Sequence, residues 1–229
     1  MNKLIIILLL LINNVAFGQD FKVISKQLSE QEINSLFTVN IKDQLQLDYV
    51  IHTVYQYKDK AGKHFIILSK NLKQCQVQDT CFDAIKVHCF LYNNAVFDLE
   101  WKLNDFIIPD SQEYTITHWT KYLKIEDYDN DGLADPIIVY GTKALNDFDD
   151  GRLKILVYYK NKKSGVRHQN GILDNERNTQ VDKQLYSLPV TIKNQVIVMM
   201  KNIVNNGHGI FPHGWQEAMK NNKLKFDEN

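Results

Sequence analysis

The sequence predicts a mainly β protein: a single domain of antiparallel strands in a meander or sandwich-like arrangement, with one packed C-terminal helix and short terminal helices. Three observations predict this class. Apolar and polar residues alternate with a period of two after about residue 49, the connections between these runs are short, and helical spacing dominates only near the C-terminus. Short connections between successive strands favour antiparallel pairing.

The first elements are a short helix and a hairpin. Residues 29–32 read Ser-Glu-Gln-Glu, a capping box that predicts a helix ending near Phe37. In the strand that follows, five residues are expected to share one face: Tyr49, Ile51, Thr53, Tyr55 and Tyr57. A turn at residues 59–62 leads into a returning strand at residues 64–69.

A second strand pair is predicted at residues 84–92 and 96–103, joined by two asparagines. Along the second of these strands, apolar residues alternate with Asp98, Glu100 and Lys102, so we expect Glu100 to face solvent. Three more strands are expected, at residues 114–125, 136–142 and 152–159.

Helical spacing returns after Pro189, a residue that is tolerated in the first turn of a helix. The expected buried stripe consists of Ile192, Val196, Met199, Met200 and Ile203. Gly207 is placed to end this helix, and a second short helix is expected at about residues 215–221.

Composition excludes some function classes. The 229 residues include 27 Lys and Arg against 27 Asp and Glu, so the formal charge is zero. A protein that binds nucleic acid or anionic membranes through bulk charge is usually strongly basic, and we expect neither partner here. The 44% of hydrophobic residues provides ample material for a core.

The N-terminus predicts export. Residues 1–18 hold one lysine, nine consecutive apolar residues and a tail that ends Ala-Phe-Gly, which are the parts of a secretory signal peptide. Cleavage before Gln19 would leave residues 19–229 as one β-rich domain in the periplasm, at the cell surface or secreted. The apolar run is about half the length of a membrane span, so no span is expected after cleavage.

Export would permit disulfides, and the chain has three cysteines. Cys75 and Cys81 flank a polar stretch between two predicted strands, so we expect them to form a bridge that pins this loop. Cys89 lies within an apolar run and is expected to be a free, buried strand residue.

One motif has a specific chemistry. Residues 127–135 place aspartates at positions 1, 3, 5 and 9 of a loop, with Gly132 at position 6. Ca²⁺ prefers six to eight oxygen ligands, and alternate residues of a tight loop can turn their oxygens inward together. The predicted ligands are the side chains of Asp127, Asp129, Asp131 and Asp135 and the backbone carbonyl of Leu133. The alternative is an acidic, solvated turn.

The loop differs from an EF-hand, because the twelfth position is Ile138 rather than Glu and strands are predicted on both sides. It resembles the calcium loops of FG-GAP/VCBS-type repeats, found in integrin-α-like propellers, in which Asp-x-Asp-x-Asp-Gly-x-x-Asp joins two strands. Residues 146–151 are similar only superficially, since their acidic residues fall out of register, and a hairpin turn is expected there.

A wider resemblance joins this loop to the run at residues 97–101 and to Phe-Pro-His-Gly-Trp at residues 211–215. Together they resemble a family of exported bacterial proteins described as surface-polysaccharide-biosynthesis proteins. The resemblance implies a role in the cell envelope and leaves the mechanism undefined.

Other candidate sites are weaker. The spacing of His208 and His213 could bind zinc, but no ligand cluster supports it, and packing roles are favoured. Glu100 and Glu126 could form the carboxylate pair of a glycosidase. The basic stretch at residues 160–168 is interpreted as a solvated hairpin face, with an anionic glycan or partner surface as the alternative.

The leading hypothesis is therefore an exported, calcium-binding protein that acts as a non-enzymatic accessory or binding factor in the bacterial envelope, with a cell-surface glycan or an envelope protein as its partner. The alternatives are a carbohydrate-active enzyme that uses a carboxylate pair, and a protein inhibitor of an envelope hydrolase.

Overall fold

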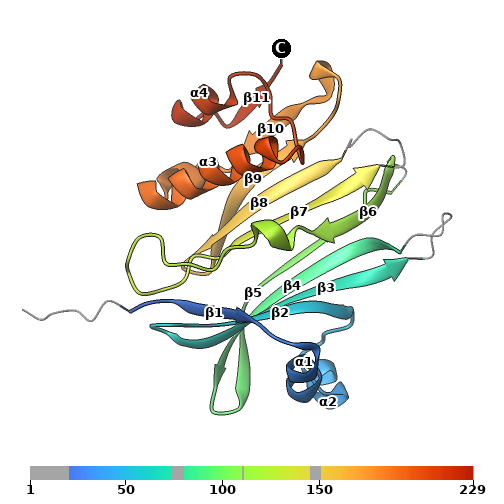
Figure 1. The fold of residues 1–229 in the computed structure, drawn as a ribbon, viewed down its shortest axis with the longest axis vertical. Coiled ribbons are helices and arrows are strands. Elements are labelled where there is room, and N and C mark those ends of the chain that lie inside the picture. Colours follow the sequence, from blue (N-terminus) through green and yellow to red (C-terminus); the bar gives the residue numbers. More distant parts are fainter. Residues whose placement is uncertain (1–20, 74–79, 110, 145–150, 229) are drawn as a thin grey trace, which may run out of the picture.

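In a computed structural model, which describes residues 21–73, 80–109, 111–144 and 151–228, the chain forms two stacked antiparallel sheets with helices on their outer faces (Figure 1). The predicted mainly β class with one longer C-terminal helix is confirmed. The predicted signal peptide, residues 1–18, lies outside the described residues.

The first sheet is a five-stranded meander whose spatial order equals the chain order. Its strands are β1 (Ile24–Gln27), β2 (Val50–Asp59), β3 (Gly62–Lys73), β4 (Cys81–Asn93) and β5 (Val96–Phe106). Two short helices, α1 (Glu30–Leu36) and α2 (Val39–Gln44), lie against its outer face (Figure 1).

The second sheet has six strands in the order β11-β10-β9-β8-β7-β6. They are β6 (Glu113–His118), β7 (Ile137–Ala144), β8 (Arg152–Tyr159), β9 (Lys162–Gln169), β10 (Asn178–Val181) and β11 (Lys225–Asp227). Helices α3 (Val190–Asn205) and α4 (Trp215–Lys220) cover its outer face. Short 3-10 helices are η1 (Thr120–Tyr122), η2 (Asp174–Glu176) and η3 (Lys183–Ser187).

Helices α1 and α3 form where the sequence predicts them. Ser29 and Glu32 form both hydrogen bonds of the capping box, and α1 ends at Leu36. All five residues of the expected α3 stripe are buried, and Gly207 follows the helix with a φ of 68°. Helix α2, which the sequence analysis missed, begins after Thr38, whose hydroxyl accepts a hydrogen bond from the Ile41 amide.

The core has three parts. Apolar side chains of the two sheets meet in the middle, where the rings of Trp101 and Tyr158 stack with their centroids 3.6 Å apart. The other two parts lie between the first sheet and α1–α2, and between the second sheet and α3–α4. Strand β8 contributes buried side chains to both faces of its sheet. Leu156 packs toward the first sheet, whereas Ile155 and Val157 pack toward α3.

β-bulges interrupt the expected alternation. In β2, Ile51 pairs with Ser69 and Thr53 with Leu68, so His52 is the extra residue. Ile51 therefore packs toward α1 and α2, whereas Tyr57 faces the second sheet, and the expectation that they share a face is wrong. The strand expected at residues 114–125 is also wrong in its second half, because β6 ends at His118 and η1 follows.

Among the described residues, no helix is both long and apolar enough to cross a membrane.

Candidate metal centre

The loop between η1 and β7 wraps around its own carboxylates. The Asp127 carboxylate accepts hydrogen bonds from the amides of Asp131 (3.2 Å) and Gly132 (2.8 Å), and Asp135 Oδ2 accepts one from the Tyr128 amide (3.0 Å). Asn130 (φ 59°) and Gly132 (φ 88°) supply the left-handed backbone that this winding needs. The carboxylates thus hold the loop backbone through hydrogen bonds, and the loop conformation directs the carboxylates toward one another.

Three of the predicted ligands converge. Asp127, Asp129 and Asp135 each offer a carboxylate oxygen, and these oxygens all lie within 4.8 Å of one another. Asp135 is almost fully buried, with 1% of its surface exposed. Burial, followed by the charges of the neighbouring aspartates, raises the pKa of Asp135 to about 7, despite the hydrogen bond from Tyr128. The arrangement can hold a metal ion, because a cation would relieve this repulsion.

The other two predicted ligands are Asp131 and Leu133. The Asp131 carboxylate pairs with Lys160 Nζ at 3.0 Å, while its Oδ1 accepts a hydrogen bond from the Leu133 amide, and Asp131 is not part of the converging cluster. Leu133, expected to offer its carbonyl oxygen, lies in the same loop between Asp131 and Asp135.

Two turns hold this loop from opposite sheets. At the end of β8, the Tyr159 hydroxyl donates to Asp129 Oδ2 (3.0 Å), and in the β8–β9 turn Lys160 pairs with Asp131. From the β2–β3 turn, the Lys60 amide donates to the Gly132 carbonyl (2.8 Å), and Asp59 Oδ2 accepts from the Ala134 amide (3.1 Å). Lys160 therefore pairs with the acidic loop, while residues 160–163 are all exposed, as the interpretation as a solvated hairpin face predicts.

Next to the loop lies a second cluster that the sequence analysis missed. His64 Nε2 lies 2.9 Å from Asp59 Oδ1, and His64 Nδ1 lies 2.8 Å from Glu100 Oε2. Burial alone would lower the pKa of His64, but the hydrogen bonds to Asp59 and Glu100 outweigh it and raise that pKa to about 9. Cys89 Sγ is 3.6 Å from the same Glu100 oxygen. The prediction that Glu100 faces solvent is therefore wrong.

A bulge explains this error. Cys89 pairs with Trp101 and Phe90 with Leu99, so Glu100 is an extra residue in β5 with no partner in β4. As a result Glu100 and the adjacent Trp101 both reach the interior between the sheets, whereas a regular pleat would send them to opposite faces. In the sequence, Glu100 is one carboxylate in an alternating strand, and an ordinary solvent-exposed strand face has the same pattern.

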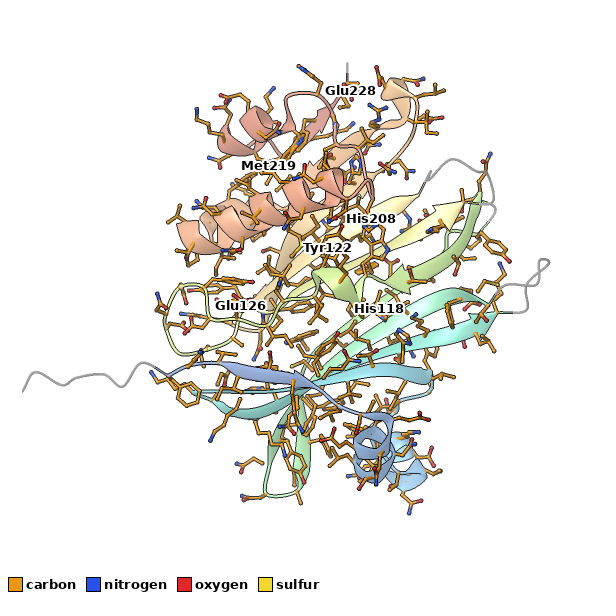
Figure 2. All side chains as sticks on the ribbon, viewed as in Figure 1. His118, Tyr122, Glu126, His208, Met219 and Glu228 are labelled. Atoms are coloured by element: carbon orange, nitrogen blue, oxygen red, sulfur yellow. The ribbon has the colours of Figure 1, made fainter. Side chains whose placement is uncertain are left out.

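The two glutamates proposed as a glycosidase pair lie in different surroundings. Glu100 is engaged by His64, by Cys89 and, at its other oxygen, by Asn161 Nδ2 (3.0 Å). Glu126 is exposed at the start of the acidic loop (Figure 2) and lines a surface cavity to which Glu100 does not contribute.

A separate cavity of about 360 Å³ lies on the second sheet beside η1. Its lining includes Trp119, Tyr122 and His208, and the Tyr122 hydroxyl lies 2.7 Å from His208 Nδ1. Figure 2 shows Tyr122 and His208 side by side between the sheet and α3. Arg152 also lines it, but its guanidinium is held by Glu113 and by the Phe106 carbonyl. His208 thus has the packing and hydrogen-bonding role that was favoured over zinc.

The cysteines are described in part. Cys81 is buried at the start of β4, and its predicted partner Cys75 lies outside the described residues, so the Cys75–Cys81 bridge stays a prediction. Cys89 is free and buried, as expected.

Comparison of the chain with protein-family models, with curated proteins and with solved structures finds no match. The resemblances to FG-GAP/VCBS-type loops and to surface-polysaccharide-biosynthesis proteins therefore stay predictions from the quoted residues.

Proposed function

We propose that residues 127–135 bind Ca²⁺, and that the protein is an exported, calcium-stabilised binding or accessory factor of the bacterial envelope without enzymatic activity. The observation that carries the proposal is the convergence of three carboxylates around the buried Asp135. Such a cluster is repulsive without a cation, and its ligand atoms are all oxygens, which a hard cation prefers.

Ca²⁺ suits this loop better than Mg²⁺ or Zn²⁺. Ca²⁺ accepts irregular shells of six to eight oxygens, Mg²⁺ demands near-octahedral geometry, and Zn²⁺ favours nitrogen and sulfur. Asp127, Asp129 and Asp135 supply the first ligands. The Leu133 carbonyl, water and Asp131 would complete the shell, the last only after its carboxylate leaves Lys160.

The cavity beside η1 supports a binding role. A volume of about 360 Å³ suits one or two sugar units. Trp119 and Tyr122 offer aromatic surface, while the Tyr122 hydroxyl and His208 offer polar groups that can orient a ligand. We therefore propose a surface glycan as the ligand, in keeping with the resemblance to polysaccharide-biosynthesis proteins.

The calcium proposal is tested by thermal unfolding of residues 19–229 with Ca²⁺, with Mg²⁺ or with chelator. Ca²⁺ should raise the Tm, and Asp129→Asn should remove most of that rise. Asp98→Asn, the same change at an exposed site on β5, is the matched control and should respond to Ca²⁺ like the wild type. Equal melting with calcium and with chelator would overturn the proposal.

The glycan proposal is tested by calorimetric titration with fragments of isolated surface polysaccharide. His208→Ala should abolish binding, whereas His213→Ala, at an exposed position that does not line the cavity, should leave it intact. Release of reducing ends during the titration would favour the enzyme alternative. Co-purification with an envelope hydrolase, without glycan binding, would favour the inhibitor alternative.

A further inference from the structure

Three potential metal ligands lie between the sheets, apart from the acidic loop. His64 on β3, Cys89 on β4 and Glu100 on β5 come from adjacent strands, and one ligand atom from each lies within 4.8 Å of the other two. The side chains of His64 and Glu100 are 2% and 15% exposed, and Cys89 is fully buried. The proposed calcium loop does not use any of them.

A β-bulge brings the carboxylate into this cluster. A bulge in β5 turns Glu100 inward, although the regular pleat would place it on the outer face. Bulges are over-represented next to functional sites, where they redirect a side chain. The result is a carboxylate, an imidazole and a thiol meeting in an interior that is otherwise lined by apolar residues such as Trp101 and Leu103.

The imidazole is also oriented as in metal sites. A metal-binding histidine usually donates a hydrogen bond from its second ring N–H, often to a carboxylate, and this bond fixes the ring orientation and the tautomer. Here Asp59 Oδ1 lies 2.9 Å from His64 Nε2, so Nδ1 faces Glu100 and the thiol. The Tyr57 ring stacks on the imidazole with the centroids 4.5 Å apart and the planes 4° from parallel. Its hydroxyl lies 3.6 Å from Cys89 Sγ.

We propose that His64 Nδ1, Cys89 Sγ and Glu100 Oε2 bind a divalent transition metal of the Zn²⁺ class, with Asp59 as the positioning residue. A nitrogen, a sulfur and an oxygen suit zinc and are unlike the all-oxygen set of the acidic loop. Tyr57 or water would take the fourth position. The metal replaces two protons, the one between His64 and Glu100 and the one on the thiol, so the charge of the buried cluster is unchanged.

Cobalt is the probe, because Co²⁺ occupies zinc sites and a thiolate ligand gives a charge-transfer band in the near ultraviolet. Reduced residues 19–229, freed of transition metals and with the acidic loop saturated with Ca²⁺, are titrated with Co²⁺. We expect this band to grow to one equivalent and to disappear when one equivalent of Zn²⁺ is added. A folded protein without the band would overturn the proposal, and the cluster would then be a carboxylate–imidazole hydrogen-bond network alone.

Variants assign the ligands. Cys89→Ser should lose the charge-transfer band, and Glu100→Gln should keep sulfur ligation but bind Co²⁺ more weakly. Asp59→Asn should weaken binding about 10–100-fold through the orientation of His64. Asp129→Asn is the matched control in the other cluster and should leave the cobalt spectrum unchanged. A band that persists in Cys89→Ser would overturn the assignment, and if this variant does not fold, an unchanged affinity in Glu100→Gln and Asp59→Asn would do so.

Discussion

Replacing Asp135 by Asn is expected to stabilise the metal-free protein and at the same time to remove its response to calcium. The Asp135 carboxyl is buried among three other aspartates, and these surroundings raise its pKa from the ordinary value of 3.8 to about 7. Asparagine is neutral, has nearly the same shape, and can still accept the hydrogen bond from the Tyr128 amide. It therefore removes the repulsion without removing the packing.

The magnitude follows from linkage. Because the folded-state pKa of Asp135 is raised, ionising this carboxyl costs folding free energy. The cost begins near pH 3.8, grows as the pH rises, and is complete above about pH 7. The full rise corresponds to about 4 kcal/mol, an upper value because the loop can relax in solution. At pH 4 the cost is below about 1 kcal/mol.

Urea unfolding with chelator, at pH 4 and pH 8, measures this difference between Asp135→Asn and the wild type. The variant should be more stable by up to about 4 kcal/mol at pH 8 and by less than about 1 kcal/mol at pH 4. With Ca²⁺ at 100 times its Kd, the wild type should gain about 2.7 kcal/mol and the variant almost nothing. A variant that is less stable than the wild type at both pH values, or that keeps the calcium response, would refute the reasoning.

Three further outcomes are expected. Lys160→Asn, which keeps a residue that tolerates the positive φ at this position, should tighten Ca²⁺ binding severalfold in low salt, measured by calorimetry, because Lys160 Nζ competes for Asp131. His64 contributes stability that is complete below pH 6.5 and is lost as the pH rises through about 9, a change of at most about 3 kcal/mol, so urea unfolding of His64→Gln should show a flatter profile over this range. Met200→Ala, at a fully buried position, should cost about 2–5 kcal/mol of unfolding free energy. Val198→Ala, at a position 45% exposed on the same helix, should cost far less.

The sequence was sufficient where a pattern is local. The capping box at Ser29 and the stripe that includes Val196 and Ile203 predicted α1 and α3, because these interactions join residues within a few positions of one another. The spacing of Asp127, Asp129 and Asp135 likewise predicted a convergent cluster, since one short loop fixes their geometry.

It was insufficient where distant segments meet. No residue near Asp131 in the sequence indicates that Lys160, in the β8–β9 hairpin, forms an ion pair with its carboxylate. Glu100 follows the alternation of a wet strand face, and only the bulge opposite Cys89 and Phe90 turns it toward His64. The period-two pattern assumes an unbroken pleat, so one inserted residue reverses the assignment of sides. Bulges leave no reliable mark in a single sequence.

Hydrogen bonds between the β2–β3 turn and the acidic loop connect the two sheets. Lys60 and Asp59 belong to the first sheet, and they hold the loop of the second sheet through Gly132 and Ala134. If cation binding makes that loop rigid, linkage requires that the hairpin of the opposite sheet open less often. Amide protons of the Asp59–Gly62 turn, where Asp59 also accepts hydrogen bonds from Ala61 and Gly62, should then exchange more slowly with Ca²⁺ than with chelator. Amide exchange in the β2–β3 hairpin would then report whether the acidic loop holds Ca²⁺, although this hairpin does not contribute a ligand to the loop.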